Sequence, residues 1–458
     1  MIQYFKKYLK YFLVISALAA LTMFVFFLGN IFDQPEVNIV PPEAPGGWKE
    51  VIEVASGMAF KGPWRMNDSM FLYVDDPTAA VAKNGDILIL WADQEKKDIF
   101  LQRYSWEGKK IFEKPINVSR TPRIFSWLPR MKISQDGSEV YIAWQEIIFS
   151  GGSHGGEILF TRSLDGGKTF SEPINLSNSL AGDGKGRLSR DIWDNGSLDI
   201  ALDKEGNIYV AWTSYEGGLM LTRSFNQGKE FLAPEHIAGS NREPARAPSL
   251  AVSSNGTIYL AWAYGEVDSE NIHFAVADGV KEPFIPRGPA VATRGFADAP
   301  NIAVDKTGTV HLVFSRAPQR FSTQSEIYYS RLDLGKEKFS EPIKISVTTN
   351  DWERSGYPKI AISDNNIYVL WELFIAREFS SRGLGFTHWS IQKDEPLPTD
   401  KLNFFIIRDG RNDDLGINGS LQGMLTNKLA ISPAGKIVIV NSTFKENESS
   451  HIWLYRNK

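Results

Sequence analysis

One hairpin pattern recurs seven times along this chain of 458 residues and constrains its fold more than any other feature. In each copy an apolar run, a short turn and a second apolar run follow one another, and most copies end in an aromatic residue. Turns such as Asn84-Gly85 and Asp136-Gly137 suit positive φ angles, and the flanking β-branched and aromatic residues favour strands. The copies are residues 79–91, 131–144, 199–212, 250–262, 302–314, 360–371 and 429–440.

A second segment follows several of these hairpins and supplies an outer strand, a loop and a last strand. Its copies are residues 99–119, 158–177, 219–239 and 327–346. Successive repeats begin about 50 to 70 residues apart, which is the range of a four-stranded propeller blade with variable loops. The sequence therefore predicts an all-β fold, a β-propeller of four-stranded blades.

The two ends of the repeat region bear on the number of blades. The seventh hairpin is followed only by the strand-like residues 451–458, so its blade lacks a fourth strand. Residues 48–56 read like the last strand of other repeats, and pairing them there removes exposed edges that invite aggregation. We predict seven blades, with an N-terminal strand closing the last one. Six blades plus an appended hairpin is the alternative.

The N-terminus predicts a membrane anchor. Residues 11–29 form an uncharged apolar run, about 28 Å long as a helix, which nearly matches a hydrocarbon core of ~30 Å. Lysines precede this run and acids follow it, which favours a cytoplasmic N-terminus and an extracytoplasmic body. We expect residues 1–32 to be a cytoplasmic tip and transmembrane signal-anchor helix, residues 33–47 a Pro-rich stalk, and residues 48–458 the propeller. A cleaved signal peptide is the alternative.

Composition limits the partners and the compartment. The formal net charge of −4, with no basic stretch interleaved with aromatics, argues against nucleic-acid binding. The absence of cysteine beyond a membrane anchor points to a bacterial envelope, with the propeller on the extracytoplasmic side of a single-pass protein. The six histidines show no metal-ligand spacing, so we expect no metal and no cofactor.

The stretch from Ser163 to Phe170, "SLDGGKTF", is the most specific motif and matches the Asp-box pattern S-x-D-x-G-x-x-W/F. Asp165 suits acceptance of backbone N–H bonds within the turn, Gly167 suits a positive φ, and Phe170 suits packing between strands. On this motif and its weaker copies, residues 48–458 resemble the sialidase superfamily of Asp-box, or BNR-repeat, propellers. The resemblance implies that the box is structural and lies away from the active site.

The same resemblance implies where catalysis would occur. Sialidases clamp a substrate carboxylate with three arginines and use a tyrosine nucleophile, a glutamate and an aspartate acid-base. Here Asp75 stands where the first arginine is expected, and Ala247 and Ala263 stand near the places of the glutamate and the second arginine. These losses argue against ordinary sialidase action. The catalytic candidates that remain are Tyr357 as nucleophile, Arg320 as third arginine, and Asp98, or else Asp93, as acid-base.

The loops that enter the hairpins carry arginines, aspartates and tryptophans, which should gather on one face. Arginines at comparable places in successive blades would form a basic ring, interrupted by acids, that holds an anionic glycan or a partner's acidic segment. The tryptophans would stack on sugar rings or simply pack between loops. This predicted rim consists of Arg123, Arg190, Arg246, Arg294, Arg354, Asp75, Asp76, Trp127 and Trp193.

Three hypotheses about function follow. The leading one is a membrane-anchored binding module for a glycan or an envelope protein, without ordinary sialidase activity. The alternative is a glycoside hydrolase that uses Tyr357 and Asp98, on a sialic or a non-sialic substrate. The third is a purely architectural envelope protein with a stable partner. Fold resemblance alone does not decide among them.

Overall fold

The computed structural model describes residues 42–458 with internal gaps. The gaps are residues 64, 66, 148–155, 180–184, 190–191, 196–197, 215–216, 266–270, 292–294, 319–324, 348–352, 376–379, 392–401 and 408–425, and at residues 185–189, 192–195, 353, 375, 380–382, 403 and 406 the backbone alone is described. The predicted anchor, residues 1–32, and most of the predicted stalk lie outside the described residues. Across the part that is described, no helix has the length and apolar character needed to cross a bilayer.

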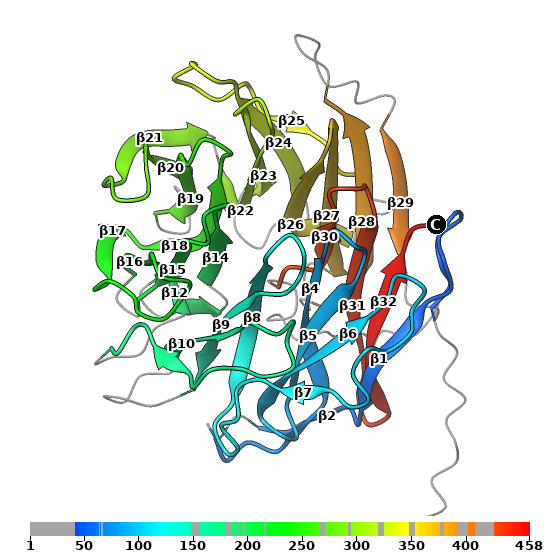
Figure 1. The fold of residues 1–458 in the computed structure, drawn as a ribbon. Helices are drawn as coiled ribbons and strands as arrows, with labels where there is room; N and C mark the ends of the chain where they lie inside the picture. The colour runs from blue at the N-terminus through cyan, green and yellow to red at the C-terminus, as the bar shows by residue number, and fades with distance from the viewer. Residues whose placement is uncertain are drawn as a thin grey trace, which may run out of the picture. The chain divides into compact units, whose positions relative to one another are not determined.

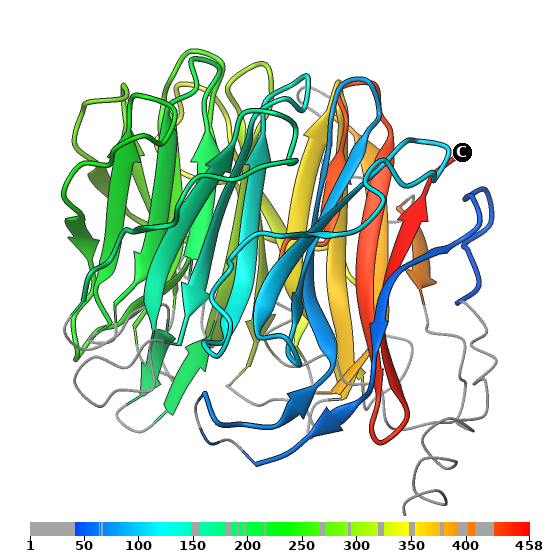
Figure 2. The same ribbon diagram turned by 60° about the horizontal axis from the view of Figure 1, so that its bottom comes forward.

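Seven antiparallel four-stranded sheets follow one another around a central channel, which confirms the predicted seven-bladed propeller (Figure 1). Each blade starts with its innermost strand and proceeds outward. In a view turned by 60°, the strands of neighbouring blades lie side by side with their long axes roughly aligned (Figure 2). Because every blade repeats the same strand order, all innermost strands begin at the same end of the channel, here called the channel mouth.

The strands of the first four blades have the following bounds, from the innermost outward. Blade 1 is β4 (Val74–Val81), β5 (Ile87–Asp93), β6 (Asp98–Tyr104) and β7 (Ile116–Asn117). Blade 2 is β8 (Ser126–Ile133), β9 (Val140–Glu146), β10 (Glu157–Ser163) and β11 (Ile174–Asn175). Blade 3 is β14 (Leu198–Leu202), β15 (Ile208–Thr213), β16 (Leu219–Ser224) and β17 (Glu235–Ala238). Blade 4 is β18 (Ala245–Val252), β19 (Ile258–Tyr264), β20 (Asn271–Ala277) and β21 (Ile285–Val291).

The remaining strands complete the ring and two small additions. Blade 5 is β22 (Phe296–Val304), β23 (Val310–Ala317), β24 (Glu326–Leu332) and β25 (Ile343–Lys344). Blade 6 is β26 (Glu353–Ser363), β27 (Asn366–Ile375), β28 (Ser380–Ser390) and β29 (Asn403–Ile407). Blade 7 is β30 (Leu429–Ile431), β31 (Ile437–Lys445), β32 (Ser449–Arg456) and β1 (Ile52–Gly57). Two-stranded sheets pair β2 (Phe60–Lys61) with β3 (Phe71–Leu72), and β12 (Lys185–Ser189) with β13 (Ile192–Asn195).

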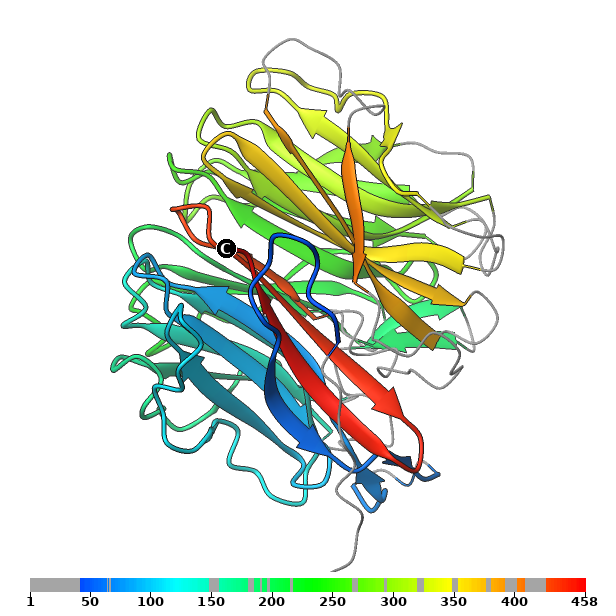
Figure 3. The ribbon, with the colours of Figure 1, turned by 90° about the vertical axis from the view of Figure 1, so that its right-hand side faces the viewer.

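The N-terminal strand closes the ring as predicted. Strand β1 pairs antiparallel with β32, with Ile52 opposite Leu454 and Gly57 opposite Ser450, and the two strands lie side by side in Figure 3. The N–H of Lys49 extends this pairing to the carbonyl of Arg456 at 2.9 Å. The pairing covers an edge that would otherwise present unpaired backbone groups.

Apolar clusters lie between neighbouring blades and hold the ring together. Leu88 and Leu90 of blade 1 share one cluster with Ile142 and Trp144 of blade 2. Equivalent clusters join blades 2 and 3, 3 and 4, 4 and 5, 5 and 6, and the closing pair formed by blades 7 and 1. A buried tryptophan removes about 150–250 Å² of surface from water, so the tryptophans of the second strands contribute several kcal/mol each.

Five innermost strands share a β-bulge at the same place. In each, a residue with positive φ precedes a proline, and the register with the second strand shifts there. Proline has no N–H to give to the ladder, so one extra residue bulges out. These five bulge residues are Asp76, Leu128, Ala247, Ala299 and Tyr357, with φ between 49° and 56°.

Polar side chains near the level of the bulges tie three innermost strands to the next one. Each accepts a hydrogen bond from a backbone N–H of the neighbouring blade, so these bonds link blades 3 to 6 along the channel wall. The three pairs are Asp199 with Leu250 at 2.8 Å, Ser249 with Ile302 at 3.0 Å, and Asn301 with Ile360 at 2.8 Å.

The turn from Ser163 to Phe170 closes on itself and onto a neighbouring blade, at the end of the channel opposite the mouth. Ser163 Oγ accepts the N–H of Gly167 at 2.9 Å and donates to Asp165 Oδ1 at 2.7 Å. Burial raises the pKa of Asp165, but hydrogen bonds from Thr169 and other donors outweigh it and hold the pKa at about 2. Phe170 packs into the cluster between blades 1 and 2.

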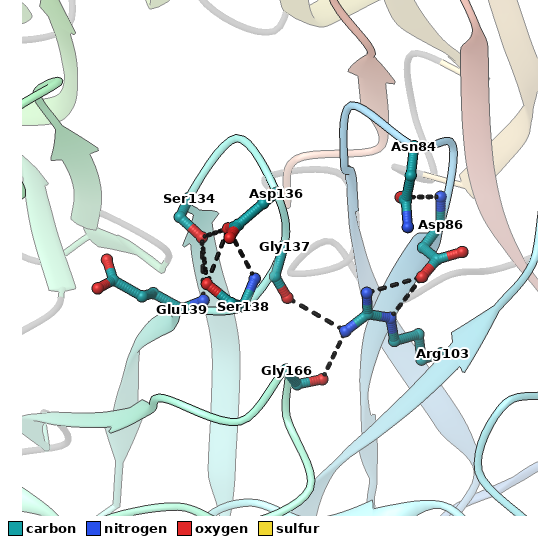
Figure 4. A network of polar contacts seen from close by, with 9 residues as sticks. All are labelled: Asn84, Asp86, Arg103, Ser134, Asp136, Gly137, Ser138, Glu139 and Gly166. Atoms are coloured by element: carbon teal, nitrogen blue, oxygen red, sulfur yellow. Dashed lines mark hydrogen bonds and ion pairs between the residues drawn. The ribbon is translucent and has the colours of Figure 1, made fainter.

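Arg103 links this turn to two hairpin turns (Figure 4). Its guanidinium donates to the carbonyls of Gly137 and Gly166, both at 3.1 Å, and pairs with Asp86 at 2.7 Å. The arginine belongs to blade 1, whereas both carbonyls belong to blade 2. The contacts of the Ser163 turn therefore hold two blades together.

Candidate binding site at the channel mouth

The bulge residues surround the channel mouth and are strained. A non-glycine residue in the left-handed region costs roughly 1–2 kcal/mol, and strain of this kind gathers where function requires a particular geometry. Two of the five, Asp76 and Tyr357, carry ionisable side chains. The side chains around these two residues make the mouth a candidate site.

Asp75 and Asp76 of β4 place two carboxylates together below the protein surface, with exposures of 1% and 0%. Ser442 Oγ donates to Asp75 Oδ1 at 2.8 Å, and the N–H of Leu128 donates to Asp76 Oδ2 at 3.1 Å. Burial, followed by the charge of Asp75, raises the pKa of Asp76 to about 8. Asp76 is therefore mostly protonated at neutral pH, so this pair carries less negative charge than its sequence suggests.

Arg246 of β18 is buried, with its side chain 1% exposed. Its Nη2 lies 3.7 Å from Asp298 Oδ1 of the next blade, and its guanidinium lies 5.9 Å from the ring centre of Phe296. By register it takes the place that Asp75 holds in blade 1, since each is the last paired residue before its bulge.

Arg354 and Tyr357 of β26 meet on one aromatic ring. The guanidinium of Arg354 lies 4.3 Å from the ring centre of Phe374, and the ring of Tyr357 lies 5.8 Å from it. Burial lowers the pKa of Arg354 to about 10, and the nearby Tyr357 acts in the opposite direction. Tyr357 is half-buried, and its N–H donates to Ser315 Oγ at 3.0 Å. A cation, a phenol and a π face therefore converge at the mouth.

Asp98, the predicted acid-base, lies at the start of the third strand of blade 1, away from Tyr357 in the fold. Its Oδ1 accepts from Ser119 Oγ at 2.7 Å, and its Oδ2 accepts from Asn117 Nδ2 at 2.8 Å. Glu157 makes the equivalent bond to Ser177 in blade 2. Asp98 is thus one copy of a repeated contact that holds an outer strand. The other candidate, Asp93, pairs with Lys96 in the turn between β5 and β6.

The remaining rim residues differ in their surroundings. Trp127 is 5% exposed, and its Nε1 donates to Gln94 Oε1 at 2.7 Å, so it packs within the protein. Arg123 is exposed in the loop before β8. The backbone of Trp193 in β13 pairs with that of Arg187 in β12, and neither side chain is described. Arg190, Arg294 and Arg320 lie outside the described residues.

The described arginines of the predicted ring do not occupy equivalent places. Arg246 immediately precedes its bulge, Arg354 lies two residues before the equivalent position, Gly356, and Arg123 lies in a loop. Two of these three are buried. Among the described residues, the arginines therefore form separate sites with their own partners.

Sequence reasoning missed a layer of buried and half-buried charge deeper in the channel. It contains Arg130 and Asp199 on innermost strands, and Lys359, Lys428 and Glu372. A signal was present, because the position that follows the bulge proline in five repeats, and the equivalent position in the other two, is polar. Those seven positions are Thr78, Arg130, Asp199, Ser249, Asn301, Lys359 and Lys428.

No family model and no curated protein matches the chain. Solved structures do match. An ulvan lyase of polysaccharide lyase family PL25 aligns with a TM-score of 0.53 at 11% identity, over 88% of this chain and 95% of that one. Its complex with -[GlcA(1-4)Rha3S]- aligns with a TM-score of 0.52. The polysaccharide lyase Uly1 aligns with a TM-score of 0.50 at 11% identity, over 90% and 100%.

A sialidase is also among the similar structures. The Hadza microbial sialidase has a TM-score of 0.43 at 13% identity, over 65% of this chain and 63% of that one. At such identities the lyases demonstrate a shared fold and nothing about activity. The part of the sialidase resemblance that is confirmed is the fold, a seven-bladed propeller, and the assignment to that superfamily stays a prediction.

Proposed function

We propose that the chain is a recognition module for an anionic carbohydrate, which binds at the channel mouth. The observation that carries the proposal is the convergence of Arg354 and Tyr357 on the ring of Phe374, beside a strained backbone. Arginine binds carboxylate and sulfate groups with two parallel hydrogen bonds, and aromatic faces stack on sugar rings. We further propose that a single-pass anchor at residues 1–32 holds the module outside the cytoplasm.

The fold comparison supports the choice of an anionic sugar. One similar structure holds -[GlcA(1-4)Rha3S]-, whose notation includes a uronate and a sulfate. Arg246, close to Asp298, supplies a second cation near the mouth. Asp75 and Asp76 repel an anionic ligand less than two ionised carboxylates would, because Asp76 is mostly neutral below about pH 8.

Binding tests this proposal directly. The full-length protein in detergent is titrated with a uronate-containing sulfated polysaccharide and with a neutral one, and affinity is measured by biolayer interferometry. We expect Arg354→Gln to weaken binding of the anionic polysaccharide at least about tenfold, as loss of a charged hydrogen bond predicts. Lys168→Gln, an exposed change at the opposite end of the channel, is the matched control. Equal affinity for both polysaccharides, or no effect of Arg354→Gln, would overturn the proposal.

A second candidate is a carbohydrate-cleaving enzyme with Tyr357 at its centre. The nearby Arg354 favours it, because a cation beside a phenol stabilises the phenolate needed for nucleophilic or base catalysis. The occupied carboxylate of Asp98 argues against that residue as the acid. Turnover of fluorogenic glycosides or polysaccharides that disappears in Tyr357→Phe would establish the enzyme. Binding without turnover supports the module, and a stable protein partner without carbohydrate binding supports an architectural role.

A further inference from the structure

A small cavity of about 80 Å³ lies in the channel below the bulges. A single water needs only about 10–15 Å³ measured in this way, so the cavity holds several waters or one small ion. Three cationic side chains line it, Arg130, Lys132 and Lys359, together with one acid, Asp199. Asn301 and Asn427 complete its polar lining. The wall of the cavity therefore carries an excess of positive charge.

The other buried cations of this layer have partners in the protein. Lys428 Nζ lies 2.6 Å from Glu372 Oε1 and 3.2 Å from Asn441 Oδ1. Arg130 Nε donates to the carbonyl of Leu198 at 3.1 Å, and its charge interacts with those of Asp199 and Asp76. Asp199 also accepts the N–H of Leu250, as described above.

Lys359 differs from these residues. No hydrogen bond or ion pair joins its ammonium to any residue that the structure describes, although protein surrounds it. An uncompensated cation in such a place is costly unless something in the cavity balances it. A ligand that carries negative charge and accepts hydrogen bonds on several sides would do so.

We propose that the channel cavity binds a small inorganic oxyanion, of sulfate or phosphate size, held by Lys359, Arg130 and Lys132. Its oxygens accept hydrogen bonds from the ammonium and guanidinium groups, and the Asn301 and Asn427 amides offer further donors. The site lies deeper than the carbohydrate site proposed at the mouth and does not depend on it. Sitting among the innermost strands of several blades, the anion would join them and stabilise the ring.

Binding of this anion should depend on pH. Burial, followed by the charge of Arg130 and to a smaller extent that of Lys428, outweighs the opposite effect of Asp199 and Glu372 and lowers the pKa of Lys359 to about 7. The anion favours the protonated lysine, so its affinity falls as pH rises through about 7.

The experiment measures the thermal midpoint of the full-length protein against sulfate or phosphate concentration, at about pH 6 and about pH 8.5. Sulfate and phosphate also stabilise proteins without specific binding, so the decisive readout is a saturable shift at millimolar concentration. We expect saturation at the lower pH and at least about tenfold weaker binding at the higher one. Lys359→Met should abolish the saturable shift, and Lys168→Met, an exposed control, should keep it.

The Lys359→Met variant should also be more stable than the natural protein in buffer without sulfate or phosphate, because the substitution removes a cation that protein surrounds and that lacks a direct partner. A saturable shift that persists in Lys359→Met, or its absence from the natural protein, overturns the proposal. A sulfated monosaccharide tests whether the anionic group in the cavity comes from a free inorganic ion or from a carbohydrate. If it gives the same Lys359-dependent shift as inorganic sulfate, the cavity belongs to the carbohydrate site and the separate inorganic site is refuted.

Discussion

Lys428 Nζ lies 2.6 Å from Glu372 Oε1 in the channel wall, and the two side chains are only 3% and 2% exposed. Lys428 directly precedes β30 of blade 7, whereas Glu372 belongs to β27 of blade 6. This ion pair therefore crosses the boundary between two blades. It also compensates one cation of the charged layer, whereas no hydrogen bond or ion pair joins the ammonium of Lys359, which faces the cavity, to any described residue.

Removing one member of this pair should be costly. Glu372→Gln leaves the Lys428 ammonium buried without its counter-ion, so we expect a loss of about 3–5 kcal/mol in the free energy of unfolding. Urea-induced unfolding measures it. The double variant Lys428→Met, Glu372→Leu should recover most of the loss, because it removes both charges while keeping the volume. If Glu372→Gln is as stable as the natural protein, Glu372 does not compensate the charge of Lys428.

Asp76 should make the protein less stable as pH rises. Its pKa is raised to about 8, so the folded state binds this proton more tightly than the unfolded chain, whose aspartate titrates near pH 3.9. The resulting stabilisation is complete below about pH 4 and is lost progressively until pH passes 8. In Asp76→Asn, the thermal midpoint should therefore change less with pH between pH 5 and pH 9 than it does in the natural protein. An unchanged slope would refute the buried protonated carboxyl.

Asp136 provides a control of opposite sign. Hydrogen bonds from Ser134 and Ser138 lower the pKa of this exposed carboxyl to about 2. A depressed pKa contributes stability above the unfolded value that disappears in acid. Asp136→Asn should therefore change the pH dependence of the thermal midpoint only below about pH 4. Between pH 5 and pH 9, the range tested for Asp76, its pH dependence should equal that of the natural protein.

The strained bulge residues should tolerate glycine better than ordinary strand residues do. Ala299 has a φ of 49°, so Ala299→Gly relieves a steric cost and should raise the free energy of unfolding by up to about 1 kcal/mol. Ala303, four residues further along β22 and also half-buried, is the matched control. In that extended position glycine should destabilise by roughly 0.5–1 kcal/mol. Equal destabilisation at both places would show that the bulge is not strained.

Closure by the N-terminal strand should be essential for a stable ring. A variant that begins at residue 59 lacks β1 and exposes the edge of β32, so we expect a lower thermal midpoint and association through that edge. Size-exclusion chromatography and thermal unfolding measure both effects. A variant that begins at residue 42 keeps β1 and serves as control. Equal stability and equal size of the two variants would argue against closure by β1.

The catalytic candidates show where counting along repeats fails. Arg246 immediately precedes the bulge of blade 4, whereas Arg354 lies two residues before the equivalent position of blade 6, so the two arginines fall at different places relative to the channel. Asp98 looked like a free carboxylate in the sequence. Its donors, Ser119 and Asn117, come from the next strand, and the sequence does not state that pairing. Trp127 was likewise open to two roles until its bond to Gln94 placed it inside the protein.

By itself, the sequence determined the number and kind of blades and the strand that closes the ring. This was possible because hairpins depend on nearby residues: a glycine at a turn, apolar residues on either side, and a length that sets the blade. Only the tertiary structure decided which charges meet in the channel. Lys359, Arg130 and Asp199 come from three different blades, and their proximity depends on ring closure and on the offset at each bulge. Burial then changes their chemistry, since a lysine or an aspartate shifts its pKa only when the surrounding protein excludes water.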